Sequence, residues 1–312
     1  MNSAIIVLGS LNMDFVVRVA HLPAHGETVL GSDFQMLPGG KGANQACAAG
    51  KLSGPGLLTR MVGRVGYDVF ADHLKASLAA AGVDVAFVHA TRSQPTGVAL
   101  IWVDRLGQNS IVVASGANHA IFASEIEGAR PAFRGARFAL FQLETPLETV
   151  EAAIALAREE GARTILDPAP AQPLSASLLQ KVDILTPNET EACILLGRNP
   201  SSVSLMEAPE MARAVRNMGP SAVVLKLGSQ GCFYSDATRE FHVPGFAVEV
   251  CDTTAAGDTF NAGLAVALAE GVELESALRF ANAAAAISVT RPGAQASQPT
   301  RADVDLFLAA RP

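Results

Sequence analysis

The amino-acid sequence predicts an α/β fold: a doubly wound, mostly parallel sheet flanked by helices on both faces, with a small β-sheet lid. The first observation is an alternation of short apolar runs with longer stretches of helical patterning, which is typical of βαβ units. The second is the length of 312 residues with 49% hydrophobic residues, which suffices for a large buried core. The third is a pair of half-polar, strand-like segments that interrupt the alternation.

The regular elements follow one another along the whole chain. Buried strands are predicted at residues 4–8, 57–62, 138–142, 164–167, 184–186 and 222–227. Helices are predicted between them at residues 43–52, 69–81, 147–160, 189–196 and 208–218.

The two interrupting segments lie at about residues 14–37 and 96–116. They contain turn residues such as Pro23, Gly26 and Gly107 and show no helical pattern. We expect them to pair as a small β lid over the ends of the main strands. Ligands of parallel sheets bind at the carboxyl ends of the strands, so the lid is expected to cover a binding site.

Composition and charge exclude several classes of function. The formal net charge is −7 and no basic cluster stands out, which argues against nucleic acid as a partner. No apolar run approaches the roughly 20 residues that cross a bilayer, and no basic segment precedes the first apolar run. We therefore expect no membrane partner and no export signal. The four cysteines lack CxxC spacing, which predicts reduced thiols in a cytoplasmic protein.

The most informative segment is residues 252–260 (DTTAAGDTF), ahead of an alanine-rich helix predicted at residues 261–270. Small residues before a helix leave backbone N–H groups unpaired and uncovered, and such a place binds anions, phosphate above all. Asp258 adds a carboxylate beside this site, which suits a base that acts on an incoming nucleophile. The alternative is an acidic first-turn residue that only favours the helix dipole.

A second glycine-rich segment, residues 38–44 (PGGKGAN), precedes the helix predicted at residues 43–52. It is not a Walker A loop, because Lys41 is followed by glycine and not by serine or threonine. Gly40 permits a polar ligand to approach the backbone closely, and Lys41 and Asn44 offer donors to hydroxyl groups. The alternative is a tight turn before a helix.

Polar side chains also follow two of the predicted strands. Asn12 and Asp14 come after the strand at residues 4–8, and Glu144 comes after the strand at residues 138–142. Carboxylates accept several hydrogen bonds, so this set suits a polyhydroxylated ligand. Singly, each residue is equally consistent with a surface cap or a turn.

Two further strand ends carry cap-type and glycine residues. Residues 186–191 (TPNETE) predict a helix start with Asn188 as N-cap and Glu191 three residues on. The functional alternative places Asn188 near a nucleotide phosphate and Glu191 near hydrated Mg²⁺. Residues 226–231 (KLGSQG) either line a nucleotide or simply join two strands.

Together and in this order, these segments resemble the PfkB carbohydrate-kinase family, and within it the ribokinase branch. Residues 39–66 are similar to the first signature of the family, and residues 252–260 are similar to the second. The segments similar to the ribokinase branch in particular are residues 9–14, 142–144, 186–191 and 283–295. The resemblance covers essentially the whole chain.

The resemblance implies one kinase domain over residues 1–312 that transfers the γ-phosphate of ATP to O5 of D-ribose. It implies Mg²⁺ with ATP, K⁺ as a monovalent-cation activator, and a homodimer that forms through the lid. By resemblance Asp258 is the catalytic base, and the backbone N–H groups of Ala255, Ala256 and Gly257 form an anion hole.

The resemblance also assigns the binding residues. The positions similar to sugar-binding residues are Asn12, Asp14, Gly40, Lys41, Asn44, Glu144 and Asp258. The positions similar to nucleotide-binding residues are Asn188, Lys226, Gly228, Ser229, Gly231, Gly257 and Asn282. The positions similar to the K⁺ site are Asp252, Thr254, Ser288, Arg291, Gly293 and Ser297, while Glu191 is similar to a residue that holds Mg²⁺ through water.

Two positions depart from the ribokinase pattern. Lys226 stands where these proteins often have threonine, so its ammonium group either favours phosphate or points to solvent. Thr254 stands where a bulkier aliphatic residue is common, and a role through its carbonyl group would survive that change.

Two alternatives to ribose phosphorylation remain open. The acceptor could be 2-deoxyribose, another sugar or a nucleoside, and a nucleoside would need aromatic surface. Phe15, Phe34 and Trp102 offer such surface unless they serve core packing. The second alternative is a catalytically silent sugar-binding or regulatory protein, against which the intact Gly257–Asp258 pair argues.

Overall fold

The structure is a computed structural model that describes residues 3–105 and 107–311. The strands of its main sheet are β1 (Ser3–Leu8), β4 (Leu57–Gly66), β5 (Val83–Thr91), β8 (Ala136–Phe141), β9 (Arg163–Leu166), β10 (Ile184–Leu185), β11 (Ala222–Lys226), β12 (Cys232–Ser235) and β13 (Glu240–Val243). The longer helices are α1 (Lys41–Leu52), α2 (Val69–Ala80), α4 (Leu147–Glu159), α6 (Glu189–Leu195), α7 (Ala208–Arg216), α8 (Ala256–Ala269), α9 (Leu274–Ser288) and α10 (Arg301–Ala309). Short α-helical turns are α3 (Arg130–Phe133) and α5 (Ala176–Leu179), and 3₁₀ turns are η1 (Gly116–Ala120), η2 (Ala123–Ala129) and η3 (Gly228–Gln230).

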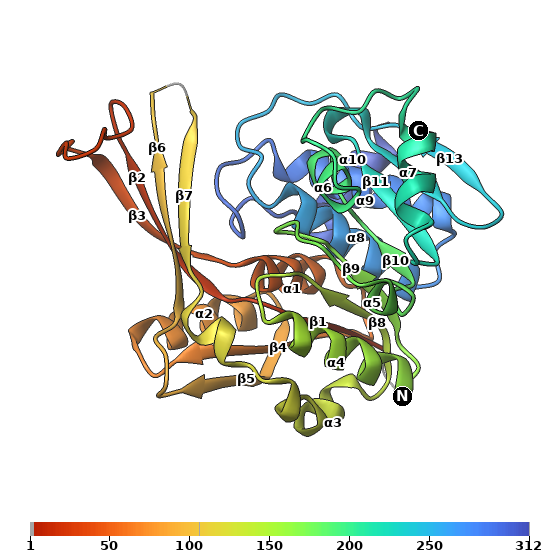
Figure 1. Cartoon of the computed structure of the whole chain (residues 1–312), viewed down its shortest axis with the longest axis horizontal. Helices are drawn as coiled ribbons and strands as arrows, with labels where there is room; N and C mark the ends of the chain where they lie inside the picture. The colour runs from red at the N-terminus through yellow and green to blue at the C-terminus, as the bar shows by residue number, and fades with distance from the viewer. Residues whose placement is uncertain (1–2, 106, 312) are drawn as a thin grey trace.

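The main sheet has nine strands in the order β13-β12-β11-β10-β9-β8-β1-β4-β5. Neighbouring strands from β11 to β5 are parallel, whereas β12 is antiparallel to both β11 and β13. The sheet is therefore mostly parallel, as the alternation of strands and helices predicts (Figure 1).

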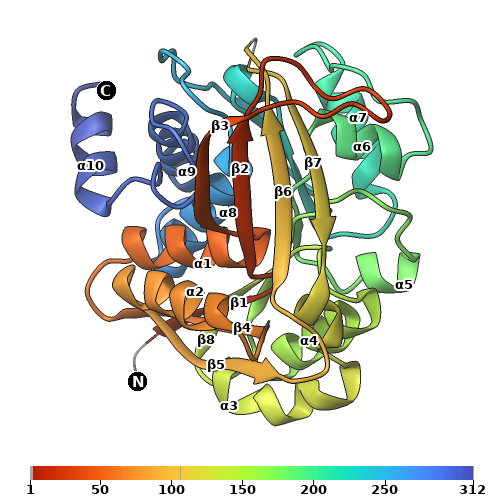
Figure 2. The same cartoon turned by 90° about the vertical axis from the view of Figure 1, so that its left-hand side faces the viewer.

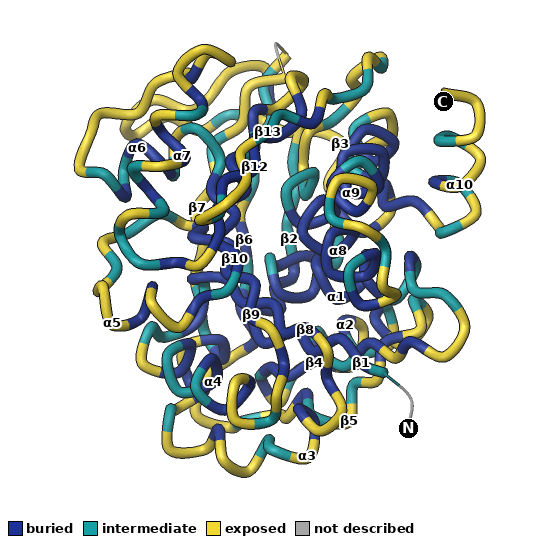
Figure 3. Tube along the Cα trace, turned by 90° about the vertical axis from the view of Figure 1, so that its right-hand side faces the viewer, coloured by how far each residue is buried: buried dark blue, intermediate teal, exposed yellow. Residues whose placement is uncertain are grey.

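Helices cover both faces of this sheet. In β1, Ile5 and Val7 pack into a core with residues of α1, α2, α8 and α9, while Ile6 and Leu8 pack into a second core with residues of α4, α6 and α7. Because β1 is buried on both faces, its sequence is a continuous apolar run without alternation. Figure 3 shows the sheet and the inner helices α1, α8 and α9 as largely buried, with exposed residues on the outer loops.

A separate four-stranded sheet stands beside the main one. Its strands are β2 (Asn12–Arg18), β3 (Ser32–Gly39), β6 (Gly97–Val103) and β7 (Asn109–Ala114), in the order β3-β2-β6-β7. The pairs β2–β3 and β6–β7 are antiparallel, and β2–β6 is parallel. Figure 2 shows the four strands extending away from the helices α1 and α2 at their base. The two segments at about residues 14–37 and 96–116 thus form one small sheet, as expected from their patterning.

The predicted elements are found with shifts of a few residues at their ends, with one correction. The helix predicted from residue 261 begins at Ala256 instead, because the Thr259 N–H donates to the Ala255 carbonyl at 2.9 Å and closes a first turn there. Gly257 and Asp258 therefore lie inside the helix. The half-polar strands β5 and β13 had no clear apolar run and were not predicted, and neither were β12, α9 and α10.

Of the three aromatic residues considered for a nucleoside base, Phe15 packs against other aromatic rings, whereas Phe34 is largely exposed. Phe15 stacks on Phe34 at 6.0 Å between ring centroids and meets Phe70 of α2 edge-on at 5.5 Å. None of the helices in the described part of the chain combines the length and apolar character needed to cross a membrane.

Candidate active site

The glycine-rich loop before α1 packs against the start of β2. Asn12 pairs with Gly39 in the β2–β3 register. Gly40 has a φ of 89°, and a Cβ there would lie 2.8 Å from the backbone nitrogen of Asn12. Only glycine combines this backbone conformation with so close an approach. The loop therefore brings the N-terminus of α1, with Lys41, against Asn12.

The side chain of Asn12 is held by a residue that the sequence did not indicate. Asn118, in η1, is buried and donates from Nδ2 to Oδ1 of Asn12 at 2.7 Å. It also clamps the backbone of Leu11, whose N–H donates to Oδ1 of Asn118 at 2.9 Å and whose carbonyl accepts from Nδ2 at 3.1 Å. Because Oδ1 of Asn12 faces Asn118, the Nδ2 group of Asn12 points away from Asn118.

Two carboxylates lie on the same side of this loop. Glu144 accepts hydrogen bonds from Oγ of Ser10 and, at 3.1 Å, from the backbone N–H of Lys41. Burial, together with the nearby charge of Glu144, raises the pKa of Asp14 from 3.8 to about 7. Asp14 therefore changes its charge near neutral pH, and it is placed to exchange hydrogen bonds with hydroxyl groups.

Asp258 is buried in the first turn of α8 and receives hydrogen bonds from α1. Nδ2 of Asn44 donates to one carboxylate oxygen at 3.2 Å, and Nε2 of Gln45 donates to the other at 3.1 Å. Burial raises the pKa of Asp258 to about 6, against the opposing effect of Lys41. A carboxylate with a pKa near 6 is ionised at neutral pH and is a stronger base than an exposed aspartate.

Lys41 is the cation at the centre of this acidic group. Burial disfavours its charge, but the carboxylates of Asp258, Asp167, Glu144 and Glu191 outweigh that effect and raise the pKa of Lys41. Lys41 therefore stays protonated and offsets the carboxylates around it.

The N-terminus of α8 presents backbone donors next to Asp258. Ala255 adopts the left-handed conformation with φ of 58° and begins the helix. The N–H groups of the first turn have no partner within the helix, although the Ala256 N–H reaches the Thr253 carbonyl over a long 3.3 Å. The resulting partial positive charge beside a carboxylate is suited to an anion.

The start of α6 is the capping box that the sequence predicts. The Glu191 N–H donates to Oδ1 of Asn188 at 2.8 Å, and the Asn188 N–H donates to Oε2 of Glu191 at 2.7 Å. Burial raises the pKa of Glu191, and Lys226 opposes this effect. Each carboxylate oxygen has a second lone pair, so this cap leaves Glu191 able to accept a water of hydrated Mg²⁺.

The loop of residues 226–231 joins β11 to β12. Gly228 and Gly231 have φ of 55° and 91°, and a Cβ on Gly231 would lie 2.2 Å from the Val243 carbonyl. Asn282 of α9 donates from Nδ2 to the carbonyls of Val243 and Pro244, each at 3.2 Å. Through these contacts the loop, with its exposed Ser229, packs against residues 243–244, which Asn282 also contacts.

Of the two alternatives considered for Lys226, the structure contradicts the one in which its ammonium group points freely into solvent. Nζ of Lys226 lies 3.1 Å from Oδ1 of Asp167, a buried residue that directly follows β9. The lysine is thus neither free for solvent nor unpaired. The sequence did not indicate Asp167, because an aspartate before a proline at a strand end looks like an ordinary turn.

The segments with the predicted cation residues meet at Asp252. Its Oδ2 accepts from the Gly293 N–H at 2.8 Å, and its Oδ1 accepts from the Thr254 N–H at 2.9 Å. Burial opposes the charge of Asp252, but these hydrogen bonds outweigh it and lower its pKa. An ionised carboxylate supplies oxygen donors of the kind that a hard cation binds.

The remaining predicted cation residues bond locally. Ser288 donates from Oγ to the Ala285 carbonyl at 2.8 Å, and Ser297 donates from Oγ to the Ala294 carbonyl at 2.8 Å. The Arg291 side chain turns outward to Asp303 at 3.5 Å. Any contribution of Arg291 to a cation would therefore come from its carbonyl group.

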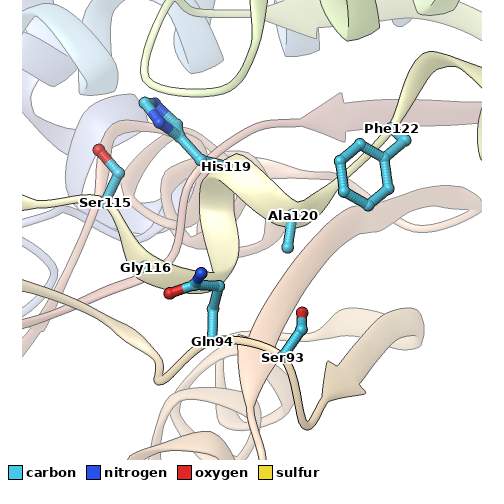
Figure 4. A pocket seen from close by; sticks show the side chains of 7 residues that line it. All are labelled: Ser93, Gln94, Ser115, Gly116, His119, Ala120 and Phe122. Carbon is cyan, nitrogen blue, oxygen red and sulfur yellow. The ribbon is translucent and has the colours of Figure 1, made fainter.

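A cavity of about 460 Å³ lies beside η1, at the base of the small sheet. It is lined by Ser93, Gln94, Ser115, Gly116, His119, Ala120 and Phe122 (Figure 4). None of the predicted site residues is among the residues that line this cavity.

The fold and the site together define a small-molecule kinase of the type that activates a hydroxyl group with a buried carboxylate. The pattern of the pfkB family carbohydrate kinases matches residues 2–301 of the sequence. The chain therefore belongs to the pfkB carbohydrate kinase family and is a sugar kinase.

Individual relatives agree with this assignment. The chain is 41% identical over 308 residues to a ribokinase of Haemophilus influenzae, covering 99% of both chains. It is similar to the structure of Arabidopsis thaliana ribokinase complexed with ribose and ATP, with a TM-score of 0.89, 34% identity and 99% of both chains covered. It is also 34% identical to a deoxyribokinase of Salmonella typhi, over 97% of this chain and 98% of the relative.

Proposed function

We propose that this protein phosphorylates D-ribose at O5 with ATP, giving ribose 5-phosphate and ADP. The observation that carries the proposal is the pair of hydrogen bonds from Asn44 and Gln45 to Asp258. They hold the buried, basic carboxylate of α8 against the start of α1, the helix that begins with Lys41. The ribokinase relatives and the ribose- and ATP-bound structure of one of them support ribose as the acceptor.

In this mechanism Asp258 accepts the proton of the O5 hydroxyl as O5 attacks the γ-phosphorus of ATP. The bond from phosphorus to the bridging oxygen breaks, and ADP leaves with the electron pair. Asn12, Asp14, Lys41 and Glu144 hold the other hydroxyl groups of the sugar. Because Asn44 and Gln45 occupy both oxygens of Asp258, its orientation toward O5 is set before the sugar binds.

Charge on the transferring phosphoryl group is met by the N-terminus of α8. The N–H groups of Ala255, Ala256 and Gly257 are backbone donors, so they need no rearrangement as charge develops. For the Ala256 N–H this requires that its long bond to Thr253 gives way to the phosphoryl oxygen.

Two metal ions belong to the proposal. Mg²⁺ neutralises the phosphates of ATP when bound, and Glu191 would hold it through water while capping α6. K⁺ would bind between the loops that Asp252 joins, with carbonyl groups of Thr254, Ser288, Arg291, Gly293 and Ser297 as further donors. This cation site adjoins the residues that lead into α8, so its occupancy would order the anion hole.

The small sheet is proposed as a lid and as the dimer interface. Large apolar side chains are exposed on its strands, among them Phe34 at 61%, Met36 at 53% and Ile111 at 52% exposure. Exposed apolar side chains gathered on one element mark an interaction surface, and a second copy of this sheet would cover them. The buried thiols of Cys47, Cys193 and Cys232 support a reducing, cytoplasmic location.

The second candidate acceptor is 2-deoxyribose, which the deoxyribokinase relative favours. The test is sugar-dependent ADP release from Mg²⁺-ATP with ribose, 2-deoxyribose, fructose and adenosine as acceptors, each with and without K⁺. Fast turnover of ribose, stimulated by K⁺, is the expected result. Turnover of another acceptor alone would refute the ribose assignment and keep Asp258 as the base, whereas no turnover of any would favour a silent binding protein.

A further inference from the structure

A buried ion pair lies on the nucleotide side of the candidate active site. Nζ of Lys226 and Oδ1 of Asp167 are 3.1 Å apart, and the two side chains are only 13% and 4% exposed. Lys226 ends β11 and Asp167 follows β9, with β10 between these strands in the sheet. The pair therefore spans the carboxyl end of β10, at the edge of the sheet where ligands bind.

Asp167 also connects to the base. Its second oxygen accepts from Nε2 of Gln45 at 3.3 Å, and the same Nε2 donates to Asp258 at 3.1 Å. Gln45 is itself held by Gln142, whose Nε2 donates to its Oε1 at 2.7 Å. One continuous set of polar contacts thus runs from the Lys226 ammonium to the carboxylate of Asp258.

The ammonium group faces the N-terminus of α8. A Cβ built on Gly257 would lie 3.3 Å from Nζ of Lys226, so the cation sits against the first turn of that helix. The backbone of Lys226 is fixed as well, because its N–H donates to the Pro187 carbonyl at 2.8 Å, next to the cap of α6. The charge therefore lies next to the N-terminus of α8, which is proposed to receive the phosphoryl group, and close to the cap of α6.

A contribution to folding stability alone does not explain why this ion pair is buried. Removing two charges from water costs about as much as their attraction returns, so a buried pair adds little to stability. An ammonium group has three donors, and the contact with Asp167 needs one. The others suit phosphate oxygens, which bind cations in charge-assisted hydrogen bonds.

We propose that Lys226 and Asp167 act as one phosphate-binding unit: Lys226 donates to the phosphate oxygens of the nucleotide, and Asp167 is the positioning residue that holds its ammonium group there. The inference rests on the proposed use of ATP and adds to it how this chain binds the phosphates. The pair also explains the lysine at a position where ribokinases often have threonine, because here a carboxylate accompanies it.

The test compares the binding of MgADP and adenosine by calorimetry, with saturating ribose present to fill the acceptor site. The variants are Lys226→Thr, Asp167→Asn and the double variant, with Lys181→Thr, an exposed lysine elsewhere, as the matched control. Lys226→Thr is expected to weaken MgADP binding by about ten- to a hundredfold, the range of a charge-assisted hydrogen bond, while adenosine binding stays at the wild-type value.

The double variant separates a unit from two independent residues. Lys226→Thr leaves the Asp167 carboxylate unpaired beside the incoming phosphates, so removing that carboxylate as well should recover part of the lost MgADP affinity. The double variant also stays informative if Lys226→Thr alone folds poorly, because it contains no unpaired buried charge.

Three outcomes would overturn the inference. If the ratio of MgADP affinity to adenosine affinity is unchanged in Lys226→Thr, then Lys226 does not contact the phosphates. Losses in the double variant equal to the sum of the single losses would show that the two residues act separately. Wild-type protein that binds no MgADP would refute the proposed use of ATP together with this inference, whereas the other two outcomes leave that use intact.

Discussion

Replacement of Asp258 by asparagine tests the proposed base through two independent measurements. The variant keeps the size of the side chain and one acceptor oxygen, but it cannot accept the proton of O5. A positioned general base is worth roughly 10²–10⁴ in rate, so kcat should fall by about that factor with ribose affinity little changed. The acid limb of the wild-type profile of kcat against pH should lie near the pKa of about 6, because Asp14 is expected to act on KM and not on kcat.

The second measurement is stability against pH. Folding raises the pKa of Asp258 from 3.8 to about 6, mainly by burial. A raised carboxyl pKa stabilises the folded state below pH 3.8, and this contribution is lost as pH rises through about 6. The pKa difference corresponds to about 3 kcal/mol, because one pKa unit is about 1.4 kcal/mol. Asparagine carries no charge at any pH, so it does not incur this penalty.

The expected result is a gain in the free energy of unfolding of Asp258→Asn over wild type that grows by up to about 3 kcal/mol between pH 4 and pH 8. Thermal or urea unfolding at several pH values measures it, with the exposed Asp72→Asn as control. Comparing the same two proteins across pH cancels any hydrogen bond that asparagine loses. A difference independent of pH, or a variant with near-normal kcat, would refute the reasoning.

Three further changes probe the rest of the site. Asp14→Asn should raise the KM for ribose by about tenfold at unchanged kcat, because the lost charged acceptor acts in the ground state too; steady-state kinetics check this, and an unaltered KM for every sugar would contradict it. Asn118→Ala should also raise the ribose KM, since Asn12 loses the contact that orients it, and normal sugar binding would show that Asn12 needs no such support. Asp252→Ala should abolish any stimulation of ADP release by K⁺ over choline while adenosine binding persists, and retained stimulation would place the cation elsewhere.

The fold could be predicted from sequence wherever burial on both faces produced continuous apolar runs. This held for β1 and for the central strands, whose runs mark their positions directly. The order of the strands could not be predicted, because pairing is decided between segments far apart in the chain. The edge strand β13 has an exposed and half-buried pattern, which looks like a loop in the sequence.

Local features of the candidate site could be predicted where a glycine or a cap residue stands at a strand end, as for the turn at Gly40 and the helix cap at Asn188. Residues that only hold other residues in place could not be predicted, because no local sequence pattern marks them. Asn118 lies in a short 3₁₀ turn without an apolar period, and its three bonds appear only once β2 and that turn are side by side. Asp167 likewise becomes informative only through its distance to Lys226.

The small sheet begins at Asn12, which is proposed to bind the sugar, and this has a consequence for how the length of the sheet can vary among relatives. Asn12 is both the first residue of β2 and a partner of Gly39 and Gly97 at the roots of β3 and β6. Changes in length are therefore expected to accumulate at the far ends of these strands, for instance in residues 19–31 between β2 and β3, and to be absent from their roots. Partners and assembly can then evolve at the far ends while the chemistry at the roots is preserved.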